Sequence, residues 1–181
     1  MVKTDSVKQQ GPGAPRGARN EAPPDDLRQW LGENGLVRLA LEAVAELDPQ
    51  QMPRRDFVHA GRAFPVAVML TLLTYCYASG RYGSQEIEDA VASDPLLRYL
   101  CAGDEPPSTA IRRFRRVYRG PLSVCLLRVF LAAVLQPRDN HGWAKRGEPG
   151  GSANLGIETA AKAAEAAIAK AVFADTTALD V

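Results

Sequence analysis

The chain is poor in the residues that build metal centres and disulfide frameworks. Its 181 residues include three cysteines and two histidines, His59 and His141. The cysteines are odd in number, form no Cys-x-x-Cys pair and lie within apolar runs, a pattern typical of small buried hydrophobic side chains in a reducing compartment. Neither histidine lies near a cysteine in sequence or near a plausible nucleophile. The sequence therefore gives almost no support to a zinc site and offers no histidine-based catalytic site.

Long apolar runs are also missing. The longest, from Phe64 to Ala78, has about 15 residues, whereas a membrane-spanning helix needs about 20. The N-terminus is polar and has no apolar segment of the kind that a secretory signal requires. The glycines at 147–151 are not followed by Gly-Lys-Ser/Thr, so they form no phosphate-binding loop. We therefore expect a cytoplasmic protein that has no membrane partner and needs no cofactor.

Helical periodicity of apolar residues runs through the middle of the chain, and no alternation indicates a β-strand. Residues 1–24 are rich in Gly, Pro, Gln and charge, and we expect them to be disordered. Residues 25–136 are expected to form a compact all-α bundle of about six helices. Residues 137–156 are typical of a flexible linker, and the alanine-rich residues 157–181 predict a further helix. The predicted helices of the bundle cover about residues 36–47, 65–79, 85–92, 96–101, 108–118 and 122–135, and a short helical segment at 27–31 precedes them, with a turn expected at Gly32 and Gly35.

Acidic residues are absent from the stretch 107–138, although the net charge of the whole chain is only +1. Residues 86–94, in contrast, hold four acids and no base. This local separation of charge carries more information about partners than the total does. The seven basic residues of the stretch are Arg112, Arg113, Arg115, Arg116, Arg119, Arg128 and Arg138.

The residues from Pro107 to Tyr118 predict a short helix with an apolar face and an arginine face. Ser108 is expected at its N-cap, because a hydroxyl there accepts a hydrogen bond from a free N–H of the first turn. The apolar face, expected to pack on the bundle, consists of Ile111, Phe114, Val117 and Tyr118. The other faces carry Arg112, Arg115, Arg116 and Arg119, with Arg113 between them.

The arginine face fits two interpretations. One is a solvated face neutralised by Glu86, Glu88, Asp89 and Asp94, and composition alone favours it. The other is contact with a nucleic-acid backbone, since a guanidinium donates paired hydrogen bonds to phosphate and clustered cations release counterions on binding. The short helices before it give a helix-turn-helix-like order. In that arrangement the residues facing the groove would be Ser108, Thr109, Arg112 and Arg113.

Four motifs in order favour the second interpretation. They are Phe64-Pro-Val-Ala-Val-Met-Leu-Thr-Leu-Leu-Thr-Tyr-Cys-Tyr-Ala-Ser-Gly80, Gly83-Ser-Gln-Glu-Ile-Glu88, Asp94-Pro-Leu-Leu-Arg-Tyr-Leu100 and Pro106-Pro-Ser-Thr-Ala-Ile-Arg-Arg-Phe-Arg115. Together they resemble the N-terminal domain of InsH-like insertion-sequence transposases. The resemblance implies binding to DNA, at the ends of an insertion sequence. We predict phosphate contacts by Arg112, Arg113, Arg115, Arg116 and Arg119, and base-edge or backbone contacts by Ser108 and Thr109.

The chain also departs from the family pattern. An Asp-His step before Ser-Thr is Pro107 here, and a Ser-Ser-Arg-Lys run is Gly83-Ser84-Gln85-Glu86, which predicts weaker DNA contact by that helix. The family's RNase H-like catalytic domain holds metal ions with three acids, and we do not expect it in this chain. Residues 173–180 resemble its first strand, where Asp175 would bind metal. One carboxylate cannot hold two metal ions, so the resemblance predicts a catalytically inactive protein.

Two other functions remain open at this point. The chain could be a non-DNA-binding helical module left from a decayed transposase, packing with another copy of itself or with a full-length transposase. It could instead be an active enzyme, which would require a complete acidic triad. DNA binding by a truncated or stand-alone transposase N-terminal domain is the prediction that we carry forward.

Overall fold

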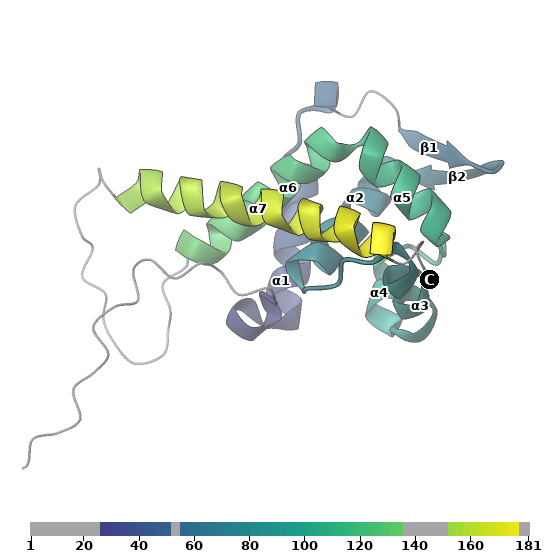
Figure 1. Ribbon diagram of the computed structural model, residues 1–181, viewed down its shortest axis with the longest axis horizontal. Helices are drawn as coiled ribbons and strands as arrows, with labels where there is room; N and C mark the ends of the chain where they lie inside the picture. The colour runs from purple at the N-terminus through teal and green to yellow at the C-terminus, as the bar shows by residue number, and fades with distance from the viewer. Residues whose placement is uncertain (1–25, 52–54, 136–151, 178–181) are drawn as a thin grey trace, which may run out of the picture.

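The computed structural model describes residues 26–51, 55–135 and 152–177. These residues form a helical bundle with one small β-hairpin at its edge (Figure 1). The helices are α1 (Arg28–Ala45), the 3-10 turn η1 (Pro49–Gln51), α2 (Val66–Ala78), α3 (Ser84–Ser93), α4 (Pro95–Leu100), α5 (Ser108–Val117), α6 (Arg119–Leu135) and α7 (Ser152–Thr177). The predicted helical bundle is confirmed. The predicted tail, residues 1–24, lies outside the described residues.

Helix α2 is the centre of the bundle, as its nearly continuous apolar sequence predicts. Every residue from Met69 to Ala78 is buried. Helices α1 and α6 pack against it, and α4 and α7 also contact it. The helix ends where Gly80 adopts a φ of +82°, a left-handed conformation that costs glycine little. The three cysteines are free and buried, as predicted.

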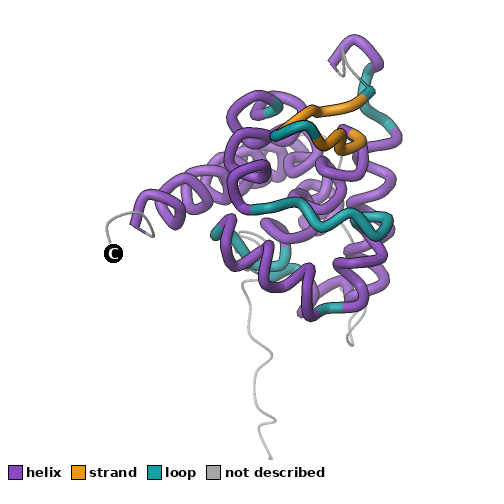
Figure 2. The backbone as a smooth tube through the Cα atoms, turned by 90° about the vertical axis from the view of Figure 1, so that its right-hand side faces the viewer, coloured by secondary structure: helices purple, strands orange, loops and turns teal. Residues whose placement is uncertain are grey.

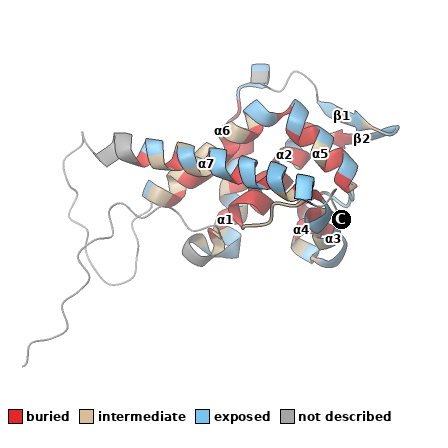
Figure 3. Cartoon of the chain, viewed as in Figure 1, coloured by how far each residue is buried: buried red, intermediate tan, exposed pale blue. Residues whose placement is uncertain are grey.

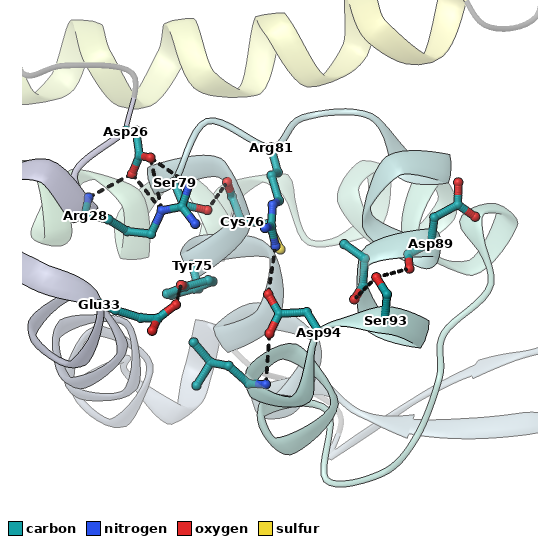
Figure 4. A network of polar contacts seen from close by, with 12 residues as sticks. Asp26, Arg28, Glu33, Tyr75, Cys76, Ser79, Arg81, Asp89, Ser93 and Asp94 are labelled. Atoms are coloured by element: carbon teal, nitrogen blue, oxygen red, sulfur yellow. Dashed lines mark hydrogen bonds and ion pairs between the residues drawn. The ribbon is translucent and has the colours of Figure 1, made fainter.

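The first helix is bent, and polar contacts tie its start to α2. Gly32 has a φ of +68° and a ψ of 161°, which interrupts α1 where a turn was predicted. Figure 4 shows the contacts: Asp26 accepts hydrogen bonds from Arg28, and the Tyr75 hydroxyl donates to Glu33 at 3.5 Å. The hydrogen bonds from Arg28 lower the pKa of Asp26. The Tyr75–Glu33 contact and a hydrogen bond from the Leu27 N–H to the Ala78 carbonyl, at 2.9 Å, hold the start of α1 against the C-terminal half of α2.

The expectation of no β-strand is wrong. Strands β1 (Asp56–His59) and β2 (Arg62–Pro65) pair antiparallel, with Phe57 opposite Phe64. Ala60 and Gly61 form the two-residue loop with φ values of +49° and +78°, the pattern of a type I′ turn. The sequence lacks the Asn-Gly or Asp-Gly signal of such a turn, and four residues per strand are too few to show a clear alternation.

The hairpin packs on α5 at one edge of the bundle (Figure 2). The ring of Phe57 lies 5.2 Å from that of Phe114 and 6.2 Å from that of Tyr118, both in edge-to-face geometry. Such aromatic pairs add packing energy beyond the area that they bury. The hairpin therefore fixes the position of α5 and brings β1 beside its first turn.

Helix α7 lies along α6 and ends near α3 (Figure 1). It begins at Ser152, so residues 152–156 belong to the helix and not to the predicted linker. Its inward face is made mostly of alanine, whereas much of its outward face is exposed (Figure 3). The buried residues of this face are Ala160, Ala164, Ala167, Ile168 and Ala171.

Among the described residues, no single helix is long and apolar enough to cross a membrane. In the part of the chain that the structure describes, one pair of helices, α5 and α6, passes such a test when both are counted together, and the two are bent by 89° relative to each other.

Candidate nucleic-acid interface

A backbone N–H at the N-terminus of α5 donates a hydrogen bond to an acid of α3, so the Ser108 hydroxyl does not have the capping role that the sequence predicted. Pro107 occupies the N-cap position, and Ser108 is the first helical residue. The Ser108 backbone N–H donates to Glu88 Oε2 at 2.9 Å, and the residue is buried. The prediction that Ser108 caps the helix is therefore wrong, and its burial does not favour the predicted contact with a groove. The physical reason is that Glu88 supplies the acceptor that a capping hydroxyl would have supplied.

Thr109 is exposed at the start of α5, where it was predicted to be available for contact. Its Oγ1 lies 3.1 Å from Nε2 of His59 on β1. The other ring nitrogen of His59, Nδ1, is buried and has no hydrogen-bond partner among the described residues. Sequence reasoning missed His59 at this site because the hairpin that carries it was not predicted.

The arginines of this region are of two kinds. We call an arginine free when it has no ion pair among the described residues, and bound when it has one. Arg113, Arg116 and Arg119 are exposed and Arg112 is half-buried. Within the described part of the chain, none of these four takes part in an ion pair. Arg112 Nε donates to the Ser108 carbonyl of its own helix at 3.5 Å, but no acid among the described residues neutralises these four guanidinium groups, so an external anion can pair with them. Arg138 lies outside the described residues, and Arg128 points to α1, donating to the Ala43 carbonyl at 3.1 Å.

The neighbouring acids do not neutralise the arginines of α5, contrary to the solvated-face interpretation. Glu86 accepts from the N–H of Gly83 at 3.3 Å, and Glu88 accepts from Ser108. Asp89 accepts from the side chain of Gln85 on its own helix. Asp94 caps α4 and pairs with Arg81 at 3.2 Å (Figure 4). The acids thus bind backbone N–H groups at helix N-termini and the side chains of Gln85 and Arg81 instead.

Arg115 is the bound arginine of α5, and its predicted place on an exposed face is wrong. It is only 5% exposed, and its guanidinium pairs with Asp175 of α7. Its Nη1 also donates to the Tyr77 hydroxyl at 3.1 Å. Burial alone would lower the pKa of Arg115, but Tyr77 and Asp175 outweigh it and hold the pKa above its ordinary value. Val117, predicted on the packed face, is instead 61% exposed.

Asp175 lies in the last turns of α7, so the resemblance of residues 173–177 to a catalytic strand is wrong. Besides Arg115, its carboxylate accepts from the backbone N–H of Ser84 at 2.8 Å and from the Ser84 hydroxyl at 2.7 Å. Ser84 is the first residue of α3, and its hydroxyl points to Asp175 on α7. The described residues contain no group of three or more His, Cys, Asp or Glu side chains able to hold a metal ion.

These side chains surround one pocket of about 630 Å³ between α5, β1 and the end of α7. Its wall contains four arginines and a single acid, and that acid is already paired with Arg115. The cavity therefore has a strong excess of positive charge, which suits a phosphate or another anion. The lining residues are His59, Thr109, Arg112, Arg113, Arg115, Arg116, Val172, Asp175 and Thr176.

The chain matches a protein family described as "Transposase domain (DUF772)" over residues 26–117. The chain belongs to this transposase domain family. The match starts at the first described residue and ends with α5, so it includes the hairpin and most of the arginine helix but neither α6 nor α7. The predicted relation to insertion-sequence transposases is confirmed at this level. No curated protein and no solved structure matches the chain.

Proposed function

We propose that this transposase domain binds duplex DNA through the free arginines of α5, at the ends of an insertion sequence. One observation carries the proposal: four neighbouring arginines have no ion pair among the described residues, although acids lie close by in sequence. The phosphate contacts are assigned to Arg112, Arg113, Arg116 and Arg119. Exposed Thr109 is assigned a base-edge or backbone contact.

The packing of the short helices supports a helix-turn-helix-like docking of α5. Helix α3 packs against both α4 and α5, and the hairpin holds the other side of α5. A helix fixed in this way can enter a groove with its first turn while cations along it contact the flanking phosphates. Ser108 takes no part in this surface because it is buried, and Arg115 takes no part in it while its guanidinium is buried and paired with Asp175.

The test compares two charge-matched double variants on duplex DNA at two salt concentrations. Arg112→Gln/Arg116→Gln removes two free arginines of α5. Arg38→Gln/Arg55→Gln removes two exposed arginines elsewhere. We expect the first variant to bind DNA at least about 10-fold more weakly. The slope of its log K plotted against log salt concentration should be shallower by about 2. The second should change affinity by about 2-fold or less, because neither of its arginines lies on α5 or lines the pocket.

Absence of binding by the unaltered chain at low salt would refute this function. An equal loss in both double variants would also count against it, because it would show a non-specific effect of net charge. Sedimentation of the same samples tests the alternative of a helical interaction module. A dimer that does not bind DNA would favour that alternative.

We further propose that these 181 residues do not cut DNA by themselves. The one acid that resembles a metal ligand, Asp175, has its carboxylate occupied by Ser84 and Arg115. A two-metal site needs several acidic oxygens around both ions. Incubation with terminal-repeat DNA and Mg²⁺ or Mn²⁺ should therefore give no cleaved strand. A metal-dependent product that is lost in Asp175→Asn would contradict this proposal.

A further inference from the structure

Three hydrogen-bond donors from three different groups converge on the Asp175 carboxylate. Its Oδ1 accepts from the Ser84 backbone N–H at 2.8 Å. Its Oδ2 accepts from the Ser84 hydroxyl at 2.7 Å and from the Arg115 guanidinium. The other terminal nitrogen of Arg115, Nη1, donates to the Tyr77 hydroxyl at 3.1 Å. All of these residues are more than nine-tenths buried.

This donor set is the type that proteins use to bind phosphate. A free N–H at a helix start, a hydroxyl and a guanidinium fork all favour an oxyanion. The Nε of Arg115 is an additional buried donor without a partner among the described residues. A carboxylate has two oxygens and both are already used, whereas a phosphate group brings further acceptor oxygens. The site is therefore not fully satisfied by the acid that occupies it.

The donors and the occupant come from different parts of the chain. Tyr77, Ser84 and Arg115 all lie inside the segment that matches the transposase domain family, whereas Asp175 lies on α7, outside it. Arg115 also lines the pocket that holds the free arginines. The phosphate-type donors are thus continuous with the surface that we assign to DNA.

The end of α7 is held to the bundle mainly by this one carboxylate. Beyond Ala171, Asp175 is the only buried residue among the described ones, and Val172, Phe173, Thr176 and Thr177 are exposed. Little apolar surface would be lost if the last turns moved away. A buried ion pair is close to energetic balance, because desolvation offsets most of the attraction. Exchange of the carboxylate for another anion is therefore feasible.

We propose that Ser84 and Arg115, supported by Tyr77, form a phosphate-binding site that Asp175 occupies as an internal competitor. A backbone phosphate of DNA enters the site when the end of α7 withdraws. This inference rests on the proposed function, because it assumes that the same pocket faces DNA. Helix α7 then lowers the affinity of the domain for DNA, and the Asp175 carboxylate determines by how much.

The first experiment measures duplex DNA affinity of the full chain by fluorescence anisotropy. Asp175→Ala removes the competitor, and Glu165→Ala removes the same charge from an exposed position of α7. We expect Asp175→Ala to bind DNA about 10-fold more tightly. The slope of its log K plotted against log salt concentration should correspond to one more phosphate contact. Glu165→Ala should differ by less than about 2-fold. Arg115→Gln/Asp175→Ala should bind DNA no more tightly than Arg115→Gln does, because the guanidinium that would bind the phosphate is absent from both.

The second experiment uses inorganic phosphate as the probe, and it also serves if Asp175→Ala is poorly folded. Millimolar phosphate should raise the melting temperature of Asp175→Ala, or restore its circular dichroism, more than chloride at equal ionic strength does. The unaltered chain and Arg115→Gln/Asp175→Ala should show no such difference. Rescue by phosphate without a gain in DNA affinity would overturn the assignment to DNA phosphate.

The two proposals fail in different ways. If the unaltered chain binds DNA through Arg112 and Arg116 but Asp175→Ala binds no tighter and phosphate rescues nothing, the internal-competitor inference is wrong and the DNA function stands. If no variant binds DNA while phosphate still rescues Asp175→Ala, the site is an anion site and the DNA function is wrong. A gain of affinity that persists in the Arg115→Gln background would show a general charge effect and overturn the inference.

Discussion

Two buried tyrosines of α2 make the stability of the protein sensitive to alkali. Burial raises the pKa of both Tyr75 and Tyr77 to about 12. In the unfolded chain a tyrosine titrates near pH 10, as model peptides do. The folded state therefore holds these protons more tightly than the unfolded state between about pH 10 and pH 12. Stability is fully present below that window and falls as the pH rises through it.

This prediction is checked by urea unfolding, followed by circular dichroism, at pH 8, 10 and 11. The free energy of unfolding should fall between the two higher values. The fall should be smaller in Tyr75→Phe/Tyr77→Phe, which lacks the two phenols whose pKa burial raises. Tyr99→Phe is the control, because Tyr99 is 77% exposed and its replacement should leave the pH dependence unchanged. An equally steep fall in the double variant would assign the effect to other groups.

Residues of the arginine helix show how far periodicity alone can predict a site. Spacing correctly placed Ile111, Phe114 and Tyr118 in the core. It placed Arg115 on the surface because no local signal indicates a buried partner, and Asp175 lies 60 positions further along the chain. A charged side chain is buried only where such a partner meets it. Long-range pairing of this kind does not appear in helical spacing.

At the scale of elements, the hairpin loop contains one of the two non-glycine residues with a positive φ among the described residues, the other being Ala102. Ala60 is a non-glycine residue with a φ of +49° in the two-residue loop. A left-handed conformation costs such a residue about 1–2 kcal/mol, whereas asparagine adopts it more readily. Ala60→Asn gives the Asn-Gly pair that this turn prefers. We expect it to raise the free energy of unfolding by about 0.5–1 kcal/mol.

The matched control is Ala63→Asn, which places the same residue at an exposed position within β2. Asparagine is disfavoured in strands, so this variant should be neutral or destabilising. Urea unfolding at neutral pH compares the two. A destabilised Ala60→Asn would mean that the loop does not adopt the left-handed pair in solution.

Elements differ in how well the sequence predicts them. The long helices were predictable because their apolar stripes extend over several turns, as in the central run from Val66 to Ala78. The hairpin was not, because each strand has four residues and its turn has no standard signal. His59 was consequently absent from the predicted site, although Thr109 and the free arginines were named.

At the scale of the whole molecule, α7 extends the transposase domain beyond its matched segment. It packs on α6 and also contacts α2 and α3. Its buried face uses small side chains, which let two helices approach closely. The alanine-rich sequence predicted a helix here but gave no information about which surface it covers. Only the structure shows that its end reaches the arginine helix.

The close approach of α7 makes one substitution diagnostic of its docking. Ala164 is 1% exposed on the buried face of α7, whereas Ala166 is exposed on the outward face of the same helix. Ala164→Phe should overpack the interface and cost about 1–3 kcal/mol, which lowers the melting temperature by roughly 2–10 °C for a chain of this size. Ala166→Phe changes the same helix by the same volume and should cost less than about 0.5 kcal/mol.

The form of the melting curve then shows whether α7 belongs to the folding unit. If α7 and the matched segment unfold together, Ala164→Phe should shift one cooperative transition, because the interface is part of the same core. A separate early transition would show that α7 detaches first. An Ala164→Phe protein as stable as Ala166→Phe would contradict the packing of α7 on α6. The internal competition by Asp175 would then lose its structural basis, because that carboxylate reaches Arg115 only while α7 is docked.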